Sequence, residues 1–237
     1  TANTSTVQYN DDASGNFEGT IQYSAADVVF AGSQAPNGVT FNGYTYLSNG
    51  DYLNTPAGTY TSLRWDGSTS AVATDGGFDG SSGHFPAARY VTSWNEMVWV
   101  AYTGESGVYH PNRVRFSKSN NGEVWESLDY LDIDLGEDGD FITAIIPDQD
   151  RLLVFKQNAV YGIYGFDRDT FEVRNLTRAA GNRDGCQPTA GRQGIFFWYA
   201  EQGVYLIQNP QNEPVWVFER IHPAMTWDVG YPALSLD

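Results

Sequence analysis

Cysteine and lysine are almost missing from this chain of 237 residues. It contains one cysteine, Cys186, and two lysines, Lys118 and Lys156. A single cysteine cannot form a disulfide within the chain, and it cannot supply a zinc site made of several thiolates. Because a lone cysteine most often serves as a small buried side chain, cysteine usage does not indicate a redox compartment here.

Long apolar runs are lacking as well. No stretch of about 18 apolar residues is present, so we expect no transmembrane helix and no membrane insertion. The start of the sequence does not have the pattern of a signal peptide. The chain begins at Thr1 instead of Met, and residues 233–237 resemble the middle of a strand. We therefore expect that the protein is processed, or that its fold continues beyond this sequence.

Basic residues are scarce. Lysine and arginine together number 13 against 29 acidic residues, which gives a net charge of −16. A chain this acidic lacks the basic surface that binding to nucleic-acid phosphates requires. The simplest interpretation is solubility, because surplus carboxylates oppose non-specific association. A second interpretation is a surface along which DNA passes without being bound.

Aromatic and turn-forming residues, in contrast, are abundant. Aromatics make up 15% of the chain, and 25 glycines and 10 prolines are scattered without a period. This composition favours short strands and tight turns. The best helix candidate, residues 24–30, is short, so the sequence predicts an all-β fold. We expect residues 1–40 to form an N-terminal arm with edge strands, and residues 41–237 to form the main domain.

The main domain repeats a pattern of strand, turn and strand. Its predicted second strands contain Val98, Leu153 and Phe196, which are 55 and 43 residues apart. Blades of β-propellers commonly have four strands in about 40–50 residues. A β-sandwich with long hairpins is the alternative. We predict a propeller-like fold of about four four-stranded blades, incomplete or part of a larger ring, at residues 41–84, 85–135, 136–180 and 181–220.

Tight turns support this division. Asn49-Gly50, between the apolar residues 44–47 and 52–53, predicts a two-residue hairpin. Residues 94–96 predict a turn into the next strand. Residues 113–117 alternate charged and apolar side chains, as a strand with a single buried face does.

Residues 119–125, with the sequence Ser-Asn-Asn-Gly-Glu-Val-Trp, resemble the Asp-box turn of sialidase-like propellers. The match is one residue short, and Asn121 stands in the place of the aspartate. Such a box is a structural turn, so it supports blades and implies no sialidase activity. We expect Trp125 to begin the outer edge strand of its blade.

Residues 126–150 are the most unusual stretch, because they hold nine acidic residues and no basic one. The alternation over residues 131–135 places two aspartates on one strand face. A solvated acidic surface is the interpretation that we favour, formed by Glu126, Asp129, Asp132, Asp134, Glu137, Asp138 and Asp140. A calcium loop is the second interpretation, although the spacing matches no EF-hand; its ligands would be Asp132, Asp134, Glu137, Asp138 and Asp140. A glycosidase carboxylate pair is the third.

Recognisable catalytic motifs are not found. The sequence contains no phosphate loop, dinucleotide-binding fingerprint or nucleophile elbow. His84, His110 and His222 fall in separate predicted loops, without the spacing typical of metal ligands. We therefore predict no catalytic residue, no metal and no cofactor.

A series of motifs between residues 85 and 207 follows a familiar order. The motifs are Asn-Arg-Val-Arg-Phe-Ser at 112–117 with Trp125, Gly-Asp-Phe-Ile-Thr-Ala at 139–144, Leu-Leu-Val-Phe-Lys at 152–156 with Val160-Tyr161, Gly181, and Gly-Ile-Phe-Phe at 194–197 with Gly-Val-Tyr at 203–205. In this order they resemble the β-propeller-type tail nozzle, or tail tubular, protein of short-tailed bacteriophages and its packaged-DNA-stabilising relatives. The resemblance covers about half of the chain.

This resemblance implies a non-enzymatic structural protein of the virion, located in the phage tail. Such a nozzle or neck component forms part of the channel for DNA ejection and a platform for fibres or receptor contact. The implied partners are other copies of the chain in a ring, and adjacent tail, adaptor or fibre proteins, while genomic DNA only passes. The alternative is a carbohydrate-binding or carbohydrate-active propeller protein, sialidase-like or an adhesin.

Overall fold

The computed structural model describes residues 37–48, 62–67, 85–105, 108–134, 140–199, 202–209 and 213–217, together with the backbone of short strands between residues 4 and 31. Every regular element in this part is a β-strand. The all-β prediction is therefore confirmed. No helix in the described part is long and apolar enough to cross a membrane.

The N-terminal residues contribute three antiparallel strand pairs. The pairs are β1 (Thr4–Thr6) with β6 (Val29–Ala31), β2 (Gln8–Tyr9) with β3 (Gly19–Thr20), and β4 (Gln22–Tyr23) with β5 (Ala26–Asp27). Residues 24–30, the best helix candidate of the sequence, thus contain β5 and the start of β6.

Four larger antiparallel sheets follow in chain order, and we call them sheets 1 to 4. Sheet 1 contains β7 (Asn37–Phe41), β8 (Tyr44–Ser48) and β9 (Ser62–Trp65), and sheet 2 contains β10 (Ala87–Trp94), β11 (Met97–Glu105), β12 (Val108–Phe116) and β13 (Tyr130–Asp132). Sheet 3 contains β14 (Ile142–Asp148), β15 (Arg151–Lys156), β16 (Val160–Tyr164) and β17 (Glu172–Thr177), and sheet 4 contains β18 (Thr189–Gly191), β19 (Gly194–Tyr199), β20 (Gly203–Ile207) and β21 (Val215–Trp216).

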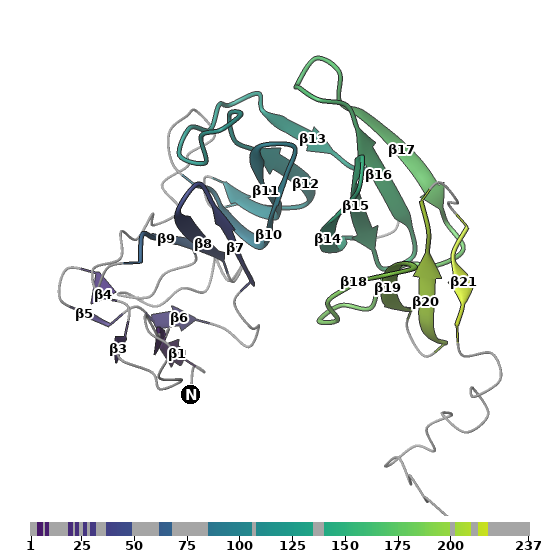
Figure 1. Ribbon diagram of the computed structural model, residues 1–237, viewed down its shortest axis with the longest axis horizontal. Helices are drawn as coiled ribbons and strands as arrows, with labels where there is room; N and C mark the ends of the chain where they lie inside the picture. The colour runs from purple at the N-terminus through teal and green to yellow at the C-terminus, as the bar shows by residue number, and fades with distance from the viewer. Residues whose placement is uncertain are drawn as a thin grey trace, which may run out of the picture.

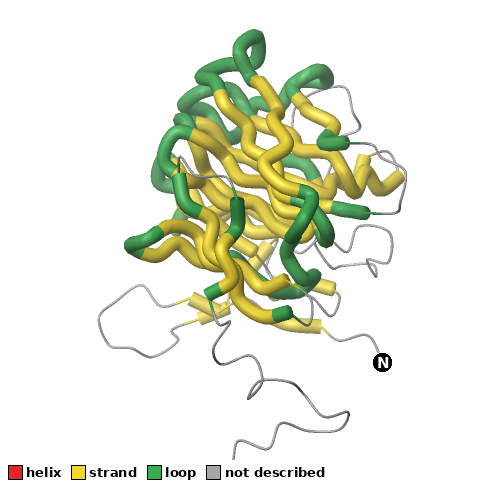
Figure 2. The backbone as a smooth tube through the Cα atoms, turned by 90° about the vertical axis from the view of Figure 1, so that its right-hand side faces the viewer, coloured by secondary structure: helices red, strands yellow, loops and turns green. Residues whose placement is uncertain are grey.

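The four sheets are arranged radially in an open arc (Figure 1). The first strand of each sheet lies nearest the centre and the last strand lies outermost, and β10 contacts both β7 and β14. Near the centre, Asn37 Nδ2 donates to Gln187 Oε1 at 3.4 Å, and Arg89 pairs with Asp184 at 3.0 Å. Figure 2 shows the strands from the side, with loops at their ends. The arrangement is that of propeller blades, although the described residues do not close a ring.

Three hydrophobic cores separate the four sheets. The core between sheets 1 and 2 contains Tyr46, Phe85, Ala88, Val91, Val98, Val100 and Trp125. The core between sheets 2 and 3 is the largest and is centred on Trp94, Trp99, Phe116, Ile145, Leu152 and Val154. The core between sheets 3 and 4 contains Ala144, Leu153, Phe155, Val160, Ala180, Ile195, Phe197 and Ile207. Two face-to-face sheets of a sandwich would share a single core, so this succession favours blades.

Because a hydrophobic core lies on each side of sheets 2 and 3, the second strands of these sheets are buried on both faces. In β15, Leu152 and Val154 pack toward sheet 2, whereas Leu153 and Phe155 pack toward sheet 4. All six residues of β15 are buried. Each large aliphatic or aromatic side chain that is removed from water stabilises the fold by about 2 kcal/mol, so the central strands hold the radial stack together.

Two tight turns set the register of sheets 1 and 2. Asn42 and Gly43, at φ 49° and 81°, connect β7 to β8, and Asn95 and Glu96, at φ 50° and 58°, connect β10 to β11. The second turn was predicted and is confirmed. The predicted hairpin at Asn49-Gly50 lies outside the described residues. Within them, β8 pairs with β7 on one edge and with β9 on the other.

The outer strand of sheet 2 also differs from the prediction. Trp125 does not begin this strand, because β13 begins only at Tyr130. The Trp125 side chain is buried in the core, and its Nε1 donates to the carbonyl of Gly122 at 2.8 Å. The fourth strand is β13, which pairs with β12. Asn121 Oδ1 accepts from the backbone N of Glu123 at 3.0 Å. The segment thus forms a closed turn that carries a core tryptophan.

Candidate functional site

The predicted acidic surface is not a single surface. Asp129 is buried, with its side chain 1% exposed, and lies 3.2 Å from Lys118 and 3.6 Å from Arg168. Glu126 is half-exposed and pairs with the same lysine at 3.0 Å. Glu137 and Asp138 lie outside the described residues. Asp129 is therefore a buried carboxylate beside two partly exposed cations from different turns, which offset the cost of its burial.

The remaining predicted acidic residues each have a partner of their own. Asp132 accepts two hydrogen bonds from Arg113, at 2.8 and 2.9 Å. Asp134 accepts from Arg178 at 2.8 Å and from the Tyr161 hydroxyl at 2.6 Å. Asp140 Oδ1 accepts from the backbone N of Gln157 at 2.8 Å.

The described members of the calcium set, Asp132, Asp134 and Asp140, do not come together. Among the described residues, no group of three or more His, Cys, Asp and Glu side chains could hold a metal ion. His110 lies in β12 and not in a loop as predicted, while His84 and His222 lie outside the described residues. These histidines therefore offer no described metal centre.

A buried charge network in sheet 2 was not predicted from the sequence. Arg115, 2% exposed, donates to both oxygens of Glu105, at 2.7 and 2.9 Å. Arg113 reaches Glu105 at 3.2 Å, and Thr103 Oγ1 donates to it at 2.7 Å. The Tyr130 ring lies 4.0 Å from the guanidinium of Arg113. The two arginines that were expected on a polar strand face are therefore enclosed by partners.

A β-bulge explains how Glu105 reaches these arginines. The pairing of β11 with β12 shifts between Ala101 and Thr103, and Tyr102 between them has φ 58°. Ala101 faces sheet 3, so an unbroken strand would direct the residues at 103 and 105 there too. The register sets Tyr102 alone opposite residues 111–113 of β12, and the positive φ of Tyr102 interrupts the alternation of the two faces. Glu105 consequently lies on the face of Arg115.

The carboxyl of Glu105 is held in its charged form. Burial alone would raise its pKa, but the hydrogen bonds from Arg115 and Thr103 and the charges of Arg115 and Arg113 outweigh burial and lower the pKa to about 2. A carboxylate that is permanently charged and fully paired cannot serve as a general acid or base near neutral pH. The network is therefore suited to holding β11, β12 and β13 together.

The turns at one end of the sheets form a continuous surface, which we call the turn face. At this end the first strand of each sheet turns into the second, and the third continues toward the fourth. Its described residues are 42–43, 95–96, 117–129, 149–150, 165–171, 192–193, 208–209 and 213–214.

Hydrogen bonds across the turn face link each neighbouring pair of sheets. Asn42 Nδ2 donates to the carbonyl of Asn120 at 2.9 Å, and Asn95 Nδ2 donates to the carbonyl of Phe166 at 2.7 Å. The amide of Asn209 donates to Asp150. These bonds fix the turns relative to one another, so the turn face is a preorganised surface.

An aromatic side chain projects from the turn face. Phe166 is 81% exposed at the turn between β16 and β17. Thr170 Oγ1 accepts from the backbone N of Phe166 at 3.0 Å and from that of Asp167 at 3.1 Å. These bonds order the backbone of the turn, so a partner that buries the aromatic ring has less backbone entropy to remove. This turn is therefore suited to contact with another protein.

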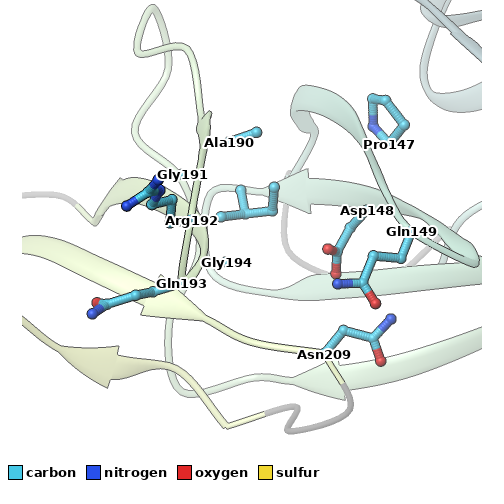
Figure 3. A pocket seen from close by; sticks show the side chains of 10 residues that line it. Pro147, Asp148, Gln149, Ala190, Gly191, Arg192, Gln193, Gly194 and Asn209 are labelled. Carbon is cyan, nitrogen blue, oxygen red and sulfur yellow. The ribbon is translucent and has the colours of Figure 1, made fainter.

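A pocket of about 340 Å³ opens on the turn face between sheets 3 and 4. Figure 3 shows Arg192 and Gln193 on one side of it, and Asp148, Gln149 and Asn209 on the other. Asp148 is the single carboxylate among the described lining residues, and it is paired with Arg151 at 2.9 Å. Amide and guanidinium groups of this kind bind hydroxyls and carboxylates, but they do not form a pair of catalytic carboxylates.

Comparison with known proteins gives no family for this chain. No protein-family model matches the sequence, and no curated protein is significantly similar to it. The resemblance to phage tail nozzle proteins therefore depends on the motifs in the sequence alone.

Proposed function

We propose that the chain is a non-enzymatic structural protein of a virion, a tail nozzle or neck component of a short-tailed bacteriophage. In this role its sheets form part of the wall of the DNA ejection channel. The order of the sequence motifs suggests the family. The observation that carries the structural part of the proposal is the use of ionisable side chains, which in the described part of the chain join strands and sheets in ion pairs.

The charge distribution supports this role. Ion pairs with acidic neighbours occupy nine basic residues of the described part: Arg64, Arg89, Arg113, Arg115, Lys118, Arg151, Arg168, Arg174 and Arg178. Each ion pair cancels one charge of each sign. The excess of 29 acidic over 13 basic residues therefore remains, and it makes the electrostatic potential of the surface negative. A channel wall of this kind repels phosphates, so DNA slides along it.

Two measurements test the proposal. Mass spectrometry of purified virus particles from the source should detect peptides of the chain, and particle imaging should locate its radial sheets on the tail axis. A labelled DNA duplex should show no anisotropy change with the purified chain at about 50 mM salt, where phosphate contacts are strongest. Absence of the chain from the particles would refute the virion role, and tight duplex binding would refute the channel wall.

The turn-face pocket favours a second candidate function, the binding of a carbohydrate. Its amide and guanidinium side chains suit sugar hydroxyls or a sugar carboxylate. A glycan array probed with the chain should then give a signal that Gln193→Ala weakens and that Gln202→Ala, a control outside the pocket, leaves unchanged. Equal signals from both variants would exclude the pocket as the binding site.

A further inference from the structure

We propose that the turn face carries a binding site for a different protein, with Phe166 as its anchor. The partner that fits this site has an apolar pocket ringed by lysine or arginine side chains. Phe166 is 81% exposed, more than any other large apolar side chain of the described residues. Its turn, between β16 and β17, projects beyond the sheets in Figure 1. The ring is therefore open to a partner, and its removal from water would favour binding.

Two further exposed apolar side chains lie in the neighbouring turn of sheet 2. Leu128 is 59% exposed and Val124 is 39% exposed. This turn adjoins that of Phe166, because Arg168 Nη1 lies 3.6 Å from Asp129 Oδ1. Three of the six exposed large apolar side chains of the described part thus lie on two adjoining turns. Single exposed apolar residues are ordinary, whereas several in one region more often mark an interaction site.

The backbone of the Phe166 turn is ordered before any partner binds. Gly165 has φ 119°, and a Cβ there would lie 2.5 Å from the carbonyl oxygen of Thr170, so glycine allows the turn to close tightly. Asn95 of sheet 2 donates to the carbonyl of Phe166. Binding therefore has little backbone entropy to remove at this turn.

The charges around Phe166 are mainly negative. These two turns and the neighbouring turn at 95–96 hold six carboxylates and two cations: Glu96, Glu123, Glu126, Asp129, Asp167 and Asp169, with Lys118 and Arg168. Both cations lie beside Asp129. Glu96, Asp167 and Asp169 are exposed, and none of them forms an ion pair within the part of the chain that the structure describes. Since an unpaired carboxylate is costly to bury, the partner must bring cations of its own.

This charge requirement separates the partner from a second copy of the chain. Nine of the 13 basic residues are already in ion pairs. The side chain of Lys156 is buried as well. A copy therefore has few cations to place against these carboxylates, and its net charge of −16 would oppose the approach. A basic partner would be attracted instead, and salt would screen that attraction.

Photo-crosslinking at position 166 tests the inference in the native setting. The chain with benzoylphenylalanine in place of Phe166 is produced in its source cells, and mass spectrometry after irradiation identifies what is joined to it. We expect an adduct with a protein other than this chain. The same group in place of Val108, which is 56% exposed at the opposite end of sheet 2, should give no adduct with that protein.

The captured protein then serves as the probe in a binding assay with the purified chain. Phe166→Ser should weaken its affinity at least about tenfold, as loss of an anchor does, and Val108→Ser should leave it unchanged. Asp169→Lys should also weaken binding, whereas Gln202→Lys, which places a lysine at another exposed turn residue, should not. Raising salt from about 50 mM to about 0.5 M should weaken binding. Thermal unfolding verifies that each variant keeps its fold.

Several results would overturn the inference. The first is the lack of any adduct at position 166, or adducts only with copies of this chain, nucleic acid or lipid. The others are equal effects of the test and control variants, and binding that strengthens in salt. The inference depends on the turns and their charges and not on the virion role, so a chain that is absent from virus particles would leave it standing.

Discussion

At the scale of single residues, the charge network around Glu105 is the clearest structural role in the molecule. Arg115 is buried in sheet 2 and donates to both Glu105 oxygens. The alternation predicted over residues 113–117 is present, with Val114 and Phe116 in the core toward sheet 3. The burial of Arg115 on the other face was not predicted, because Glu105 reaches that face only through the bulge at Tyr102. No pattern in the sequence marks this bulge, since Tyr102 is not one of the residue types that favour positive φ.

Removal of one partner from this network should be costly. Arg115→Leu would leave Glu105 buried beside fewer cations, so we expect a loss of about 3–5 kcal/mol in the free energy of unfolding. Urea denaturation at pH 7 measures it. Arg174→Leu is the matched control, because Arg174 and Glu172 form an exposed pair in β17 whose loss should leave the midpoint unchanged. Equal midpoints for both variants would contradict the role of the network.

At the scale of secondary structure, the turns show where sequence patterns suffice. The strands of sheets 3 and 4 lie within residues 136–180 and 181–220, the ranges predicted for two blades. Local pattern is most informative for strands such as β16 and β19, which are continuous apolar runs between turns. Sheet 1 was harder, since Asn-Gly occurs three times in this region, at 37–38, 42–43 and 49–50, and each could form the same type of hairpin. Local sequence cannot show which strands pair with β8, because one of them, β9, comes from a more distant position in the chain.

The hairpin of β7 and β8 should depend on the backbone of Gly43. This residue has φ 81°, and a Cβ there would meet nothing within 4 Å, so Gly43→Ala tests backbone strain alone. We expect a loss of about 1 kcal/mol in unfolding free energy, because alanine disfavours the left-handed region. Gly43→Asn should cost less, since asparagine enters this region more readily. Thermal unfolding of both variants measures the difference; an asparagine variant less stable than the alanine variant would contradict this account.

At the scale of the whole molecule, two electrostatic effects oppose each other as the pH falls. The net charge of −16 destabilises the compact chain through self-repulsion, and protonation of surface carboxylates relieves it. Glu105, with its pKa lowered to about 2, stabilises the fold fully above the ordinary carboxyl pKa, near 4.5. This contribution is lost as the pH falls from there through the folded pKa.

We therefore expect the unfolding temperature to hold or rise slightly from pH 7 to about pH 5, and to fall steeply between about pH 4.5 and pH 2. Scanning calorimetry across this range measures the profile. In the Glu105→Gln variant the steep acid limb should be shallower, because the group that loses stability on protonation is gone. The same acid limb in both proteins would show that other carboxylates dominate.

The overall architecture could be predicted better than its chemistry. Strand length, turn residues and blade spacing are local properties, and together they led to a propeller-like fold. The pocket and the ion pairs of the buried Asp129 could not be found in this way, because Arg168 and Asn209 approach their partners from other sheets or other turns. The acidic stretch appeared as one surface in the sequence, but its members are distributed over separate contacts.

The links across the turn face have a consequence for how this protein can vary. Asn42 and Asn95 both donate to main-chain oxygens, those of residues 120 and 166. Every amino acid carries such an oxygen, so these two bonds make no demand on the side chains of the accepting residues, although the positive φ of Asn120 limits exchange there. The loops can thus acquire new side chains for recognition without disturbing the scaffold, and position 166 is already displayed outward for that purpose.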